Sequence, residues 1–217
     1  MILSQDELIH AEILSFSRPL TVDIDYCLEC DVDGVNLVVP TSELHIHDKL
    51  NTTCDKLIEL SNNAVDYCKD HGLIVELSAE DASRSNIDFL RKVYLNAIDH
   101  GADRVCVCDT VGILTPDSSF ELFSKLNDLS VPVACHCHND FGLAVANTLS
   151  AIKGGASEIH TTINGIGERA GNTSFEECVV SIDRLFPQFS TNIKINEIYD
   201  ISNLVARSTG VYIQPNK

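Results

Sequence analysis

Two histidines separated by one residue lie near the centre of the segment "ACHCHNDFGLAVAN", Ala134 to Asn147. In an extended strand successive side chains point to opposite faces, so His136 and His138 share one face and the two flanking cysteines share the other. Two neutral imidazoles on one face can take adjacent positions on one divalent ion. The pair is therefore a candidate metal site, and two hydrogen-bonded histidines without a metal are the alternative.

A glycine-rich stretch, "NGIGERAGN", follows the next apolar run and precedes a helix that we expect to begin near Thr173 and Ser174. Asn172 ends this stretch with an amide oxygen that could coordinate the same ion, and Glu168 and Arg169 can pair to hold the loop in shape. An ordinary glycine-rich turn between a strand and a helix is the alternative. Together with the two histidines, the loop favours a functional site.

Short apolar or β-branched runs alternate with helical segments along the chain, which predicts a parallel sheet with helices packed outside it. The runs expected to form strands are 11–17, 34–42, 73–81, 104–110, 132–140 and 158–167. The segments expected to form helices are 54–72, 86–102, 116–129, 141–156, 174–186 and 195–210. Nearly every strand ends in polar or reactive residues, which favours a barrel over an open sheet with a single switch point.

The strand count predicts an α/β fold of the TIM (β/α)8 type that is incomplete, with about six of the eight βα units present. Ser4 and Glu7 form a capping-box pattern, so we also expect a helix ahead of the first strand. We expect residues 1–190 to form a partial catalytic barrel and residues 191–217 to begin a C-terminal accessory helical segment.

The composition excludes several classes of partner. The chain has 217 residues and a formal net charge of −17, which repels nucleic-acid phosphates and anionic lipid headgroups. No apolar run reaches the roughly 20 residues of a membrane span, and the N-terminus has no signal-peptide pattern, so we expect a cytoplasmic protein. The nine cysteines favour reduced, buried residues over a disulfide framework, with "CLEC", Cys27 to Cys30, as an alternative zinc or redox site.

The motifs "HCHNDFGLAVAN" and "NGIGERAGN", preceded by "ELSAEDASRS" and "CDTVGILTP", resemble the metal-dependent family of 2-isopropylmalate, citramalate and homocitrate synthases, which is related to 3-hydroxy-3-methylglutaryl-CoA lyase. Within this family we expect the greatest resemblance to the archaeal type of 2-isopropylmalate synthase. The resemblance implies a divalent ion, Zn, Mg or Mn, held by His136, His138 and Asn172. It also implies an aspartate ligand from a strand of D-x-x-x-R-D-G type, which has no counterpart upstream of Ala11.

The resemblance implies a Claisen condensation, in which the enolate of acetyl-CoA attacks a metal-polarised 2-oxoacid and the thioester is then hydrolysed. Thr110 matches a catalytic threonine that binds the oxoacid carboxylate, and Ser78 matches a polar residue that lines the substrate site. Asn36 falls where family members often carry a histidine or an acid facing the substrate. Glu80 matches a second catalytic position that can exchange a proton with the substrate or with water. Each of these side chains could instead tie down its own loop.

Glu76 stands where the homocitrate branch tends to place an arginine for the distal carboxylate of its substrate. An acid there would repel a dicarboxylic oxoacid, so we expect a monocarboxylic substrate, with 2-oxoisovalerate ranked ahead of pyruvate. The expected product is then 2-isopropylmalate, and the expected pathway is leucine biosynthesis. Citramalate or homocitrate synthesis is the alternative within the family. The expected partners are acetyl-CoA, a 2-oxoacid, and a second copy or another chain that supplies the missing strands. The alternative outside this set of enzymes is that the chain is a non-catalytic barrel fragment, or one part of a split barrel that needs a partner for the missing strands.

Overall fold

The computed structural model describes residues 11–189 and 191–213, so the helix expected at Ser4 and Glu7 lies outside the described residues. Each of the six runs expected to form strands contains one. The strands are β1 (Leu14–Ser17), β2 (Gly34–Pro40), β3 (Ile74–Glu80), β4 (Arg104–Asp109), β5 (Val133–Cys137) and β6 (Glu158–His160).

The strands follow one another in the sheet in chain order, β1-β2-β3-β4-β5-β6. The ladders that join β1 to β2, β2 to β3 and β3 to β4 are parallel. A doubly wound sheet would reverse its strand order at a switch point, whereas a (β/α)8 barrel keeps chain order. The sequential order therefore agrees with the predicted arc of a barrel.

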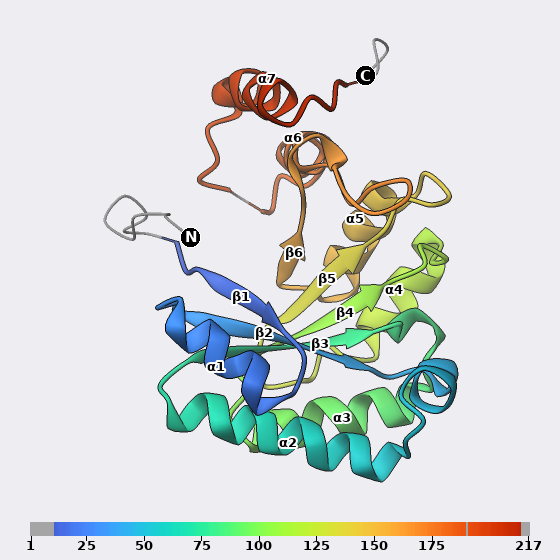
Figure 1. Cartoon of the computed structure of the whole chain (residues 1–217). Coiled ribbons are helices and arrows are strands. Elements are labelled where there is room, and N and C mark those ends of the chain that lie inside the picture. The colour runs from blue at the N-terminus through green and yellow to red at the C-terminus, as the bar shows by residue number, and fades with distance from the viewer. Residues whose placement is uncertain (1–10, 190, 214–217) are drawn as a thin grey trace. The chain divides into compact units, whose positions relative to one another are not determined.

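The chain divides into two compact units, Met1–Cys108 with Asp128–Ala134 and Asp109–Asn127 with Cys135–Lys217. In the first unit, helices cover one face of the strands (Figure 1). These helices are α1 (Thr21–Glu29), α2 (Cys54–Asp70) and α3 (Ile87–Asp99), with the short helices η2 (His45–Lys49) and η3 (Ala82–Arg84) after β2 and β3. Val35, Leu37 and Val39 alternate along β2 and are fully buried, as period-two burial of a strand requires.

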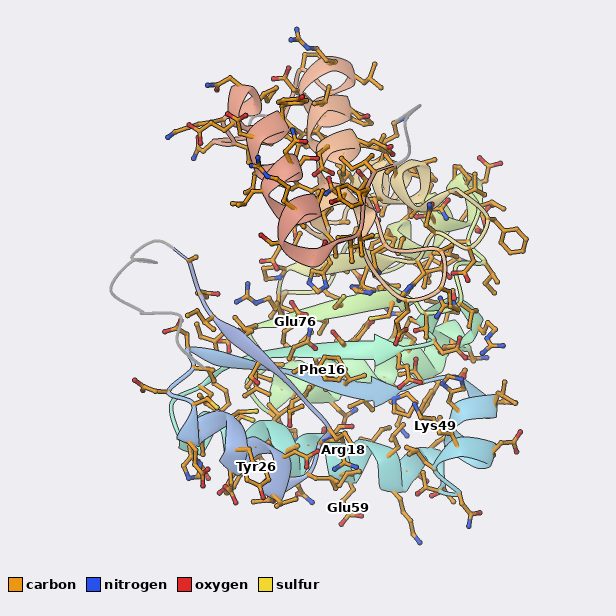
Figure 2. All side chains as sticks on the ribbon, turned by 45° about the horizontal axis from the view of Figure 1, so that its top comes forward. Phe16, Arg18, Tyr26, Lys49, Glu59 and Glu76 are labelled. Atoms are coloured by element: carbon orange, nitrogen blue, oxygen red, sulfur yellow. The ribbon has the colours of Figure 1, made fainter. Side chains whose placement is uncertain are left out.

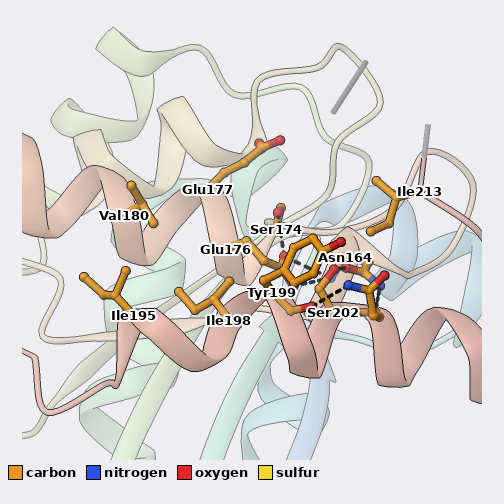
Figure 3. A pocket seen from close by; sticks show the side chains of 11 residues that line it. Asn164, Ser174, Glu176, Glu177, Val180, Ile195, Ile198, Tyr199, Ser202 and Ile213 are labelled. Atoms are coloured by element: carbon orange, nitrogen blue, oxygen red, sulfur yellow. Dashed lines mark hydrogen bonds between the residues drawn. The ribbon is translucent and has the colours of Figure 1, made fainter. Parts of the chain in front are cut away.

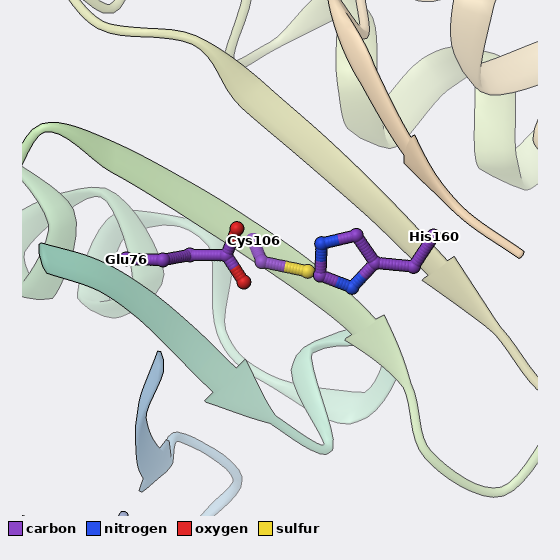
Figure 4. A group of neighbouring side chains, drawn as sticks. All are labelled: Glu76, Cys106 and His160. Atoms are coloured by element: carbon purple, nitrogen blue, oxygen red, sulfur yellow. The ribbon is translucent and has the colours of Figure 1, made fainter. Parts of the chain in front are cut away.

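The other face of these strands carries polar side chains. Asn36 of β2 stands in register with Glu76 of β3, and Ser78 stands in register with Cys106 of β4. Figure 2 shows Glu76 on the strands, away from Tyr26 and Glu59 on the helices. Glu76 and Cys106 approach each other within 4.8 Å from neighbouring strands (Figure 4). The face of these strands that lies away from the helices therefore carries mainly polar side chains, with Phe16 of β1, in register with Asn36, as an exposed apolar one.

The second unit contains α4 (Pro116–Ser124), α5 (Ala144–Gly154), α6 (Phe175–Leu185) and α7 (Ile198–Thr209), with the short helices η4 (Ile163–Gly165) and η5 (Ile195–Glu197). The side chain of Thr115 accepts from the N–H of Ser118 in a capping box that begins α4. Helices α4 and α5 pack closely because Gly154 has no side chain: a Cβ atom there would lie 2.7 Å from the carbonyl oxygen of Phe120.

All nine cysteines lie within the described residues as free thiols, and six of them are buried. Cys27 is buried and Cys30 is exposed, so the two thiols of "CLEC" face different surroundings. Burial raises the pKa of Cys178 to about 12, which leaves this thiol protonated and unreactive at neutral pH. In the part of the chain that the structure describes, no helix has the length and apolar character needed to cross a membrane.

Candidate functional site

The three residues expected to hold a metal come together in the second unit. His136 lies on β5 and His138 follows that strand, and their ring centroids are 5.2 Å apart. Cys135 and Cys137 are fully buried on the opposite face, as strand alternation predicts. Asn172 reaches the histidines through an isolated antiparallel bridge with His138.

The side-chain amide of Asn172 has a defined orientation. Its Nδ2 atom lies 3.1 Å from Nε2 of His136 and 3.3 Å from the carbonyl oxygen of Cys137. A carbonyl oxygen only accepts, so the group that faces it is the NH2 group, and the amide oxygen points the other way. Gly167 makes room for that oxygen, since a Cβ atom at this glycine would lie 1.9 Å from it. A half-turn of the amide would present the oxygen to His136 instead.

The site residues fit a divalent cation. Nδ1 of His138 is buried and has no hydrogen-bond partner among the described residues, which is unusual for a buried polar atom. Burial and the charge of Arg169 lower the pKa of His138, so its imidazole is neutral at neutral pH. Neutral imidazole nitrogens and an amide oxygen are ligand atoms that can coordinate Zn²⁺ or Mn²⁺.

Arg169 links the three loops that carry the site. Its guanidinium donates to both carboxylate oxygens of Asp140, at 2.7 and 2.9 Å, and to the carbonyl oxygen of Thr110, at 2.7 Å. The predicted pair with Glu168 is present but longer, at 3.5 Å. Arg169 has a φ of 55°, a strained value for a residue with a side chain. The hydrogen bond from Arg169 also holds the pKa of Asp140 below its usual range.

Replacing Arg169 by Ala should lower the affinity for a divalent metal by about 10- to 100-fold, because groups that orient ligand loops typically contribute that much. The loops that carry Thr110, Asp140 and Asn172 would lose their common tie. Isothermal titration of the metal-free chain with Mn²⁺ measures the affinity. The unfolding temperature should change little, since the pair with Asp140 is partly exposed to solvent.

Arg91 provides a matched control, because it makes a bidentate pair with Asp128 in the first unit. Replacing Arg91 by Ala should leave the affinity for Mn²⁺ unchanged. Equal losses of affinity in the two variants would show that Arg169 has no special relation to the site.

The other residues expected to act on the substrate belong to the first unit, except Thr110. Nδ2 of Asn36 donates to Glu76 at 2.6 Å, and Oγ of Ser78 donates to the same carboxylate oxygen at 3.3 Å. Both carboxylate oxygens of Glu80 accept from Nζ of Lys49, at 2.7 and 2.8 Å. Lys49 was not among the residues that the sequence singled out, because a lysine on a helical turn carries no pattern that relates it to a strand end.

A second missed residue is His160, at the end of β6, whose Nδ1 atom lies 3.3 Å from Nδ1 of His136. It falls within a run that the sequence assigned to a strand, but contact between neighbouring strands cannot be read from spacing within either one. The histidines of the second unit therefore form a set of three, with His136 between the other two.

A pocket of about 380 Å³ lies between α6 and α7, and none of the expected site residues lines it (Figure 3). Asn164, with a φ of 63°, donates from its side chain to the carbonyl oxygen of Ser202 and accepts from the hydroxyl of Ser202. Its N–H donates to the carboxylate of Glu176. The polar residues that line this pocket therefore hydrogen-bond to one another, and these bonds hold α7 against the loop after β6.

The sequence matches the family model described as HMGL-like over residues 4–205. The chain is 55% identical over 210 residues to the (R)-citramalate synthase of Methanocaldococcus jannaschii, covering 96% of this chain and 43% of that protein. It is 45% identical over 208 residues to the 2-isopropylmalate synthase of the same organism, covering 95% of this chain and 40% of that protein. The chain thus spans about two fifths of the length of these relatives.

Solved structures with the same fold include the HMG-CoA lyases of Bacillus subtilis and Pseudomonas aeruginosa. The TM-scores are 0.81 and 0.82 at 16% and 17% identity, and each match covers 93% of this chain and 71% of the other. At these identities the likeness concerns the fold alone. Together with the strand order, it confirms the predicted incomplete TIM barrel.

Proposed function

This chain belongs to the HMGL-like family, and from that premise we propose that it serves the metal-dependent condensation of acetyl-CoA with a 2-oxoacid. The observation that carries the proposal is the meeting of His136, His138 and Asn172 in one unit, with a buried ring nitrogen of His138 that has no partner among the described residues. A divalent ion bound there would act as a Lewis acid on the carbonyl group of the oxoacid.

The remaining site residues receive roles that follow from their chemistry. The hydroxyl of Thr110 would bind the carboxylate of the oxoacid, and its position is supported by the bond from Arg169 to its carbonyl oxygen. Asn36 and Ser78 would line the substrate site from the polar face of the first unit. Glu80 would move a proton at the substrate or at water, with Lys49 holding both of its oxygens. We further propose residues 1–190 as the partial catalytic domain and residues 191–217 as the start of the accessory segment.

Glu76 supports a monocarboxylic oxoacid. Its carboxylate is buried, at 3% exposure, and is held by Asn36 and Ser78. A second carboxylate on the substrate would meet this buried acid without a compensating cation from either of those residues, and like charges in a buried site repel strongly. The proposal therefore excludes 2-oxoglutarate from the expected substrates.

Of the two monocarboxylic oxoacids, we propose that pyruvate is the preferred substrate and that 2-oxoisovalerate is the second candidate. In one organism the citramalate synthase is 55% identical to this chain and the 2-isopropylmalate synthase 45%. Citramalate has the five carbon atoms of an acetyl group joined to pyruvate, so the greater similarity supports the smaller oxoacid. This order reverses the one expected from the sequence alone, and 2-oxoisovalerate stays the second candidate within the same reaction.

The test is an assay of CoA release by chromatography, which avoids the chain's own thiols. The chain is assayed alone and joined to the leading segment of the M. jannaschii citramalate synthase, with acetyl-CoA, Mn²⁺ and one oxoacid at a time. We expect CoA release with pyruvate to exceed CoA release with 2-oxoisovalerate by at least about tenfold. A pocket shaped for the smaller oxoacid can discriminate to this extent against one or two additional carbon atoms. Absence of release with every 2-oxoacid would overturn the proposed function.

A further inference from the structure

His160 lies directly against His136, the middle histidine of the second unit. Their rings meet edge-on, with centroids 5.4 Å apart and planes at 84°, and their Nδ1 atoms are 3.3 Å apart. When two neutral imidazoles form a hydrogen bond through their ring nitrogens, one nitrogen carries the proton and donates it, and the other accepts. Which ring donates depends on the other contacts of His136, and its contact with Asn172 decides the direction.

The ring nitrogen of His136 that carries the proton can be identified from the hydrogen bonds that connect this ring, through Asn172, to the carbonyl oxygen of Cys137. The NH2 group of Asn172 faces the carbonyl oxygen of Cys137, so the nitrogen that lies 3.1 Å from Nε2 of His136 is a donor. Nε2 of His136 must then accept, and in a neutral imidazole the other nitrogen, Nδ1, carries the proton. Nδ1 of His136 therefore donates to Nδ1 of His160, whose own proton is on Nε2.

We propose that His160 is a positioning residue for the metal site, an inference that rests on the proposed function. By accepting from Nδ1, His160 stabilises the Nδ1–H tautomer of His136 together with Asn172, and it continues to do so when the amide of Asn172 turns its oxygen toward an ion, so that Nε2 stays the ligand nitrogen. It also sets the plane of the ring, because the contact is made edge-on. Histidines that bind metals generally donate their second ring N–H to such a partner, which is most often a carboxylate or a carbonyl oxygen. An imidazole in that role adds no negative charge to the site.

The first experiment measures the tautomer in the metal-free chain labelled with ¹⁵N, by long-range proton–nitrogen correlation of the histidine rings. The His136 signals are assigned by their loss in H136N. We expect the wild-type chain to show His136 as the Nδ1–H tautomer and His160→Ala to show a smaller fraction of that tautomer, because the contact with Asn172 then acts without the one to His160. His160→Asn should keep the wild-type pattern, because the asparagine Oδ1 atom can take the place of Nδ1 as acceptor. An Nδ1–H fraction in H160A equal to that of the wild type would overturn the proposal.

The second experiment titrates the same proteins with Mn²⁺ and follows free Mn²⁺ by electron paramagnetic resonance. We expect the dissociation constant to rise about 10- to 100-fold in H160A and to stay within about threefold of wild type in H160N. Thermal unfolding of each variant separates positioning from folding. Equal losses in H160A and H160N, with lower unfolding temperatures in both, would show a structural role and overturn the proposal.

The outcomes distinguish this inference from the proposed function. Mn²⁺ binding that is equally tight in wild type and H160A would overturn the role of His160 and leave the proposed function standing. A wild-type chain with the expected tautomer that binds no Mn²⁺ would overturn the metal site itself, and the role of His160 in it would fail with the metal site.

Discussion

Replacing His136 and His138 together by Ala should lower the affinity of the chain for Mn²⁺ by more than about 100-fold, since loss of outer partners alone costs 10- to 100-fold. The two rings lie next to each other, with centroids 5.2 Å apart, and both would be removed as ligands. The fold should persist, because the buried face of β5 is formed by Cys135 and Cys137, which the variant keeps. Isothermal titration with Mn²⁺ measures the affinity, and circular dichroism checks the fold.

The control variant removes two other histidines. His47 and His71 are exposed residues of the first unit, and the ring of His71 hydrogen-bonds the carbonyl oxygen of Tyr67 and packs against the ring of the same residue. The double variant H47A and H71A should bind Mn²⁺ with wild-type affinity. An equal loss in both double variants would mean that the metal binds to histidines in general, which would contradict a site at β5.

Replacing Asp109 by Ala should give the largest loss of stability among the single changes considered, about 2 kcal/mol or more in the free energy of unfolding. Its carboxylate has zero exposure and accepts from the N–H groups of Ile113 and Leu114, at 3.0 and 3.1 Å. Removing the acceptor leaves both donors without this partner; the bond of Leu114 is buried, and an unsatisfied buried donor costs about 1–3 kcal/mol, to which the part-buried bond of Ile113 adds. The turn that presents Thr110 would also lose its support.

Urea denaturation followed by circular dichroism measures this loss. Asp109→Asn should recover part of it, because one amide oxygen remains as an acceptor. The exposed Asp117, at the start of α4, is the control, and its replacement by Ala should change the free energy of unfolding by less than about 0.5 kcal/mol. A stable D109A variant would show that the two N–H groups find other acceptors, and the turn would then not depend on Asp109.

Much of the fold could be predicted from the sequence, because alternation of strand and helix patterns is a local property. All six expected strands are present, and the helix after the glycine-rich loop begins at Phe175 with Ser174 as its N-cap. The shared face of His136 and His138 follows from strand geometry in the same way. The short helix α1, Thr21–Glu29, was not expected, since its apolar and polar residues show little helical periodicity.

The contacts of the site could not be predicted, because they join residues far apart in the chain. The sequence suggested that Arg169 pairs with its neighbour Glu168, whereas its shorter bonds reach Asp140 and Thr110. The amide of Asn172 likewise turns its nitrogen to His136, an orientation set by the carbonyl of Cys137. Spacing along a chain identifies which residue types gather at strand ends, but the partners of each polar atom depend on loop conformation.

The most direct test of the central claim, that the second unit holds a divalent cation at His136, His138 and Asn172, is anomalous diffraction from crystals of the chain soaked in Mn²⁺. We expect one strong anomalous peak within about 2.0–2.3 Å of a ring nitrogen of each histidine, which is the zinc–histidine distance of about 2.0–2.1 Å with a tolerance of about 0.2 Å. The amide of Asn172 should be turned so that its oxygen faces the ion. A peak elsewhere in the molecule, with none at these two histidines, would contradict the claim.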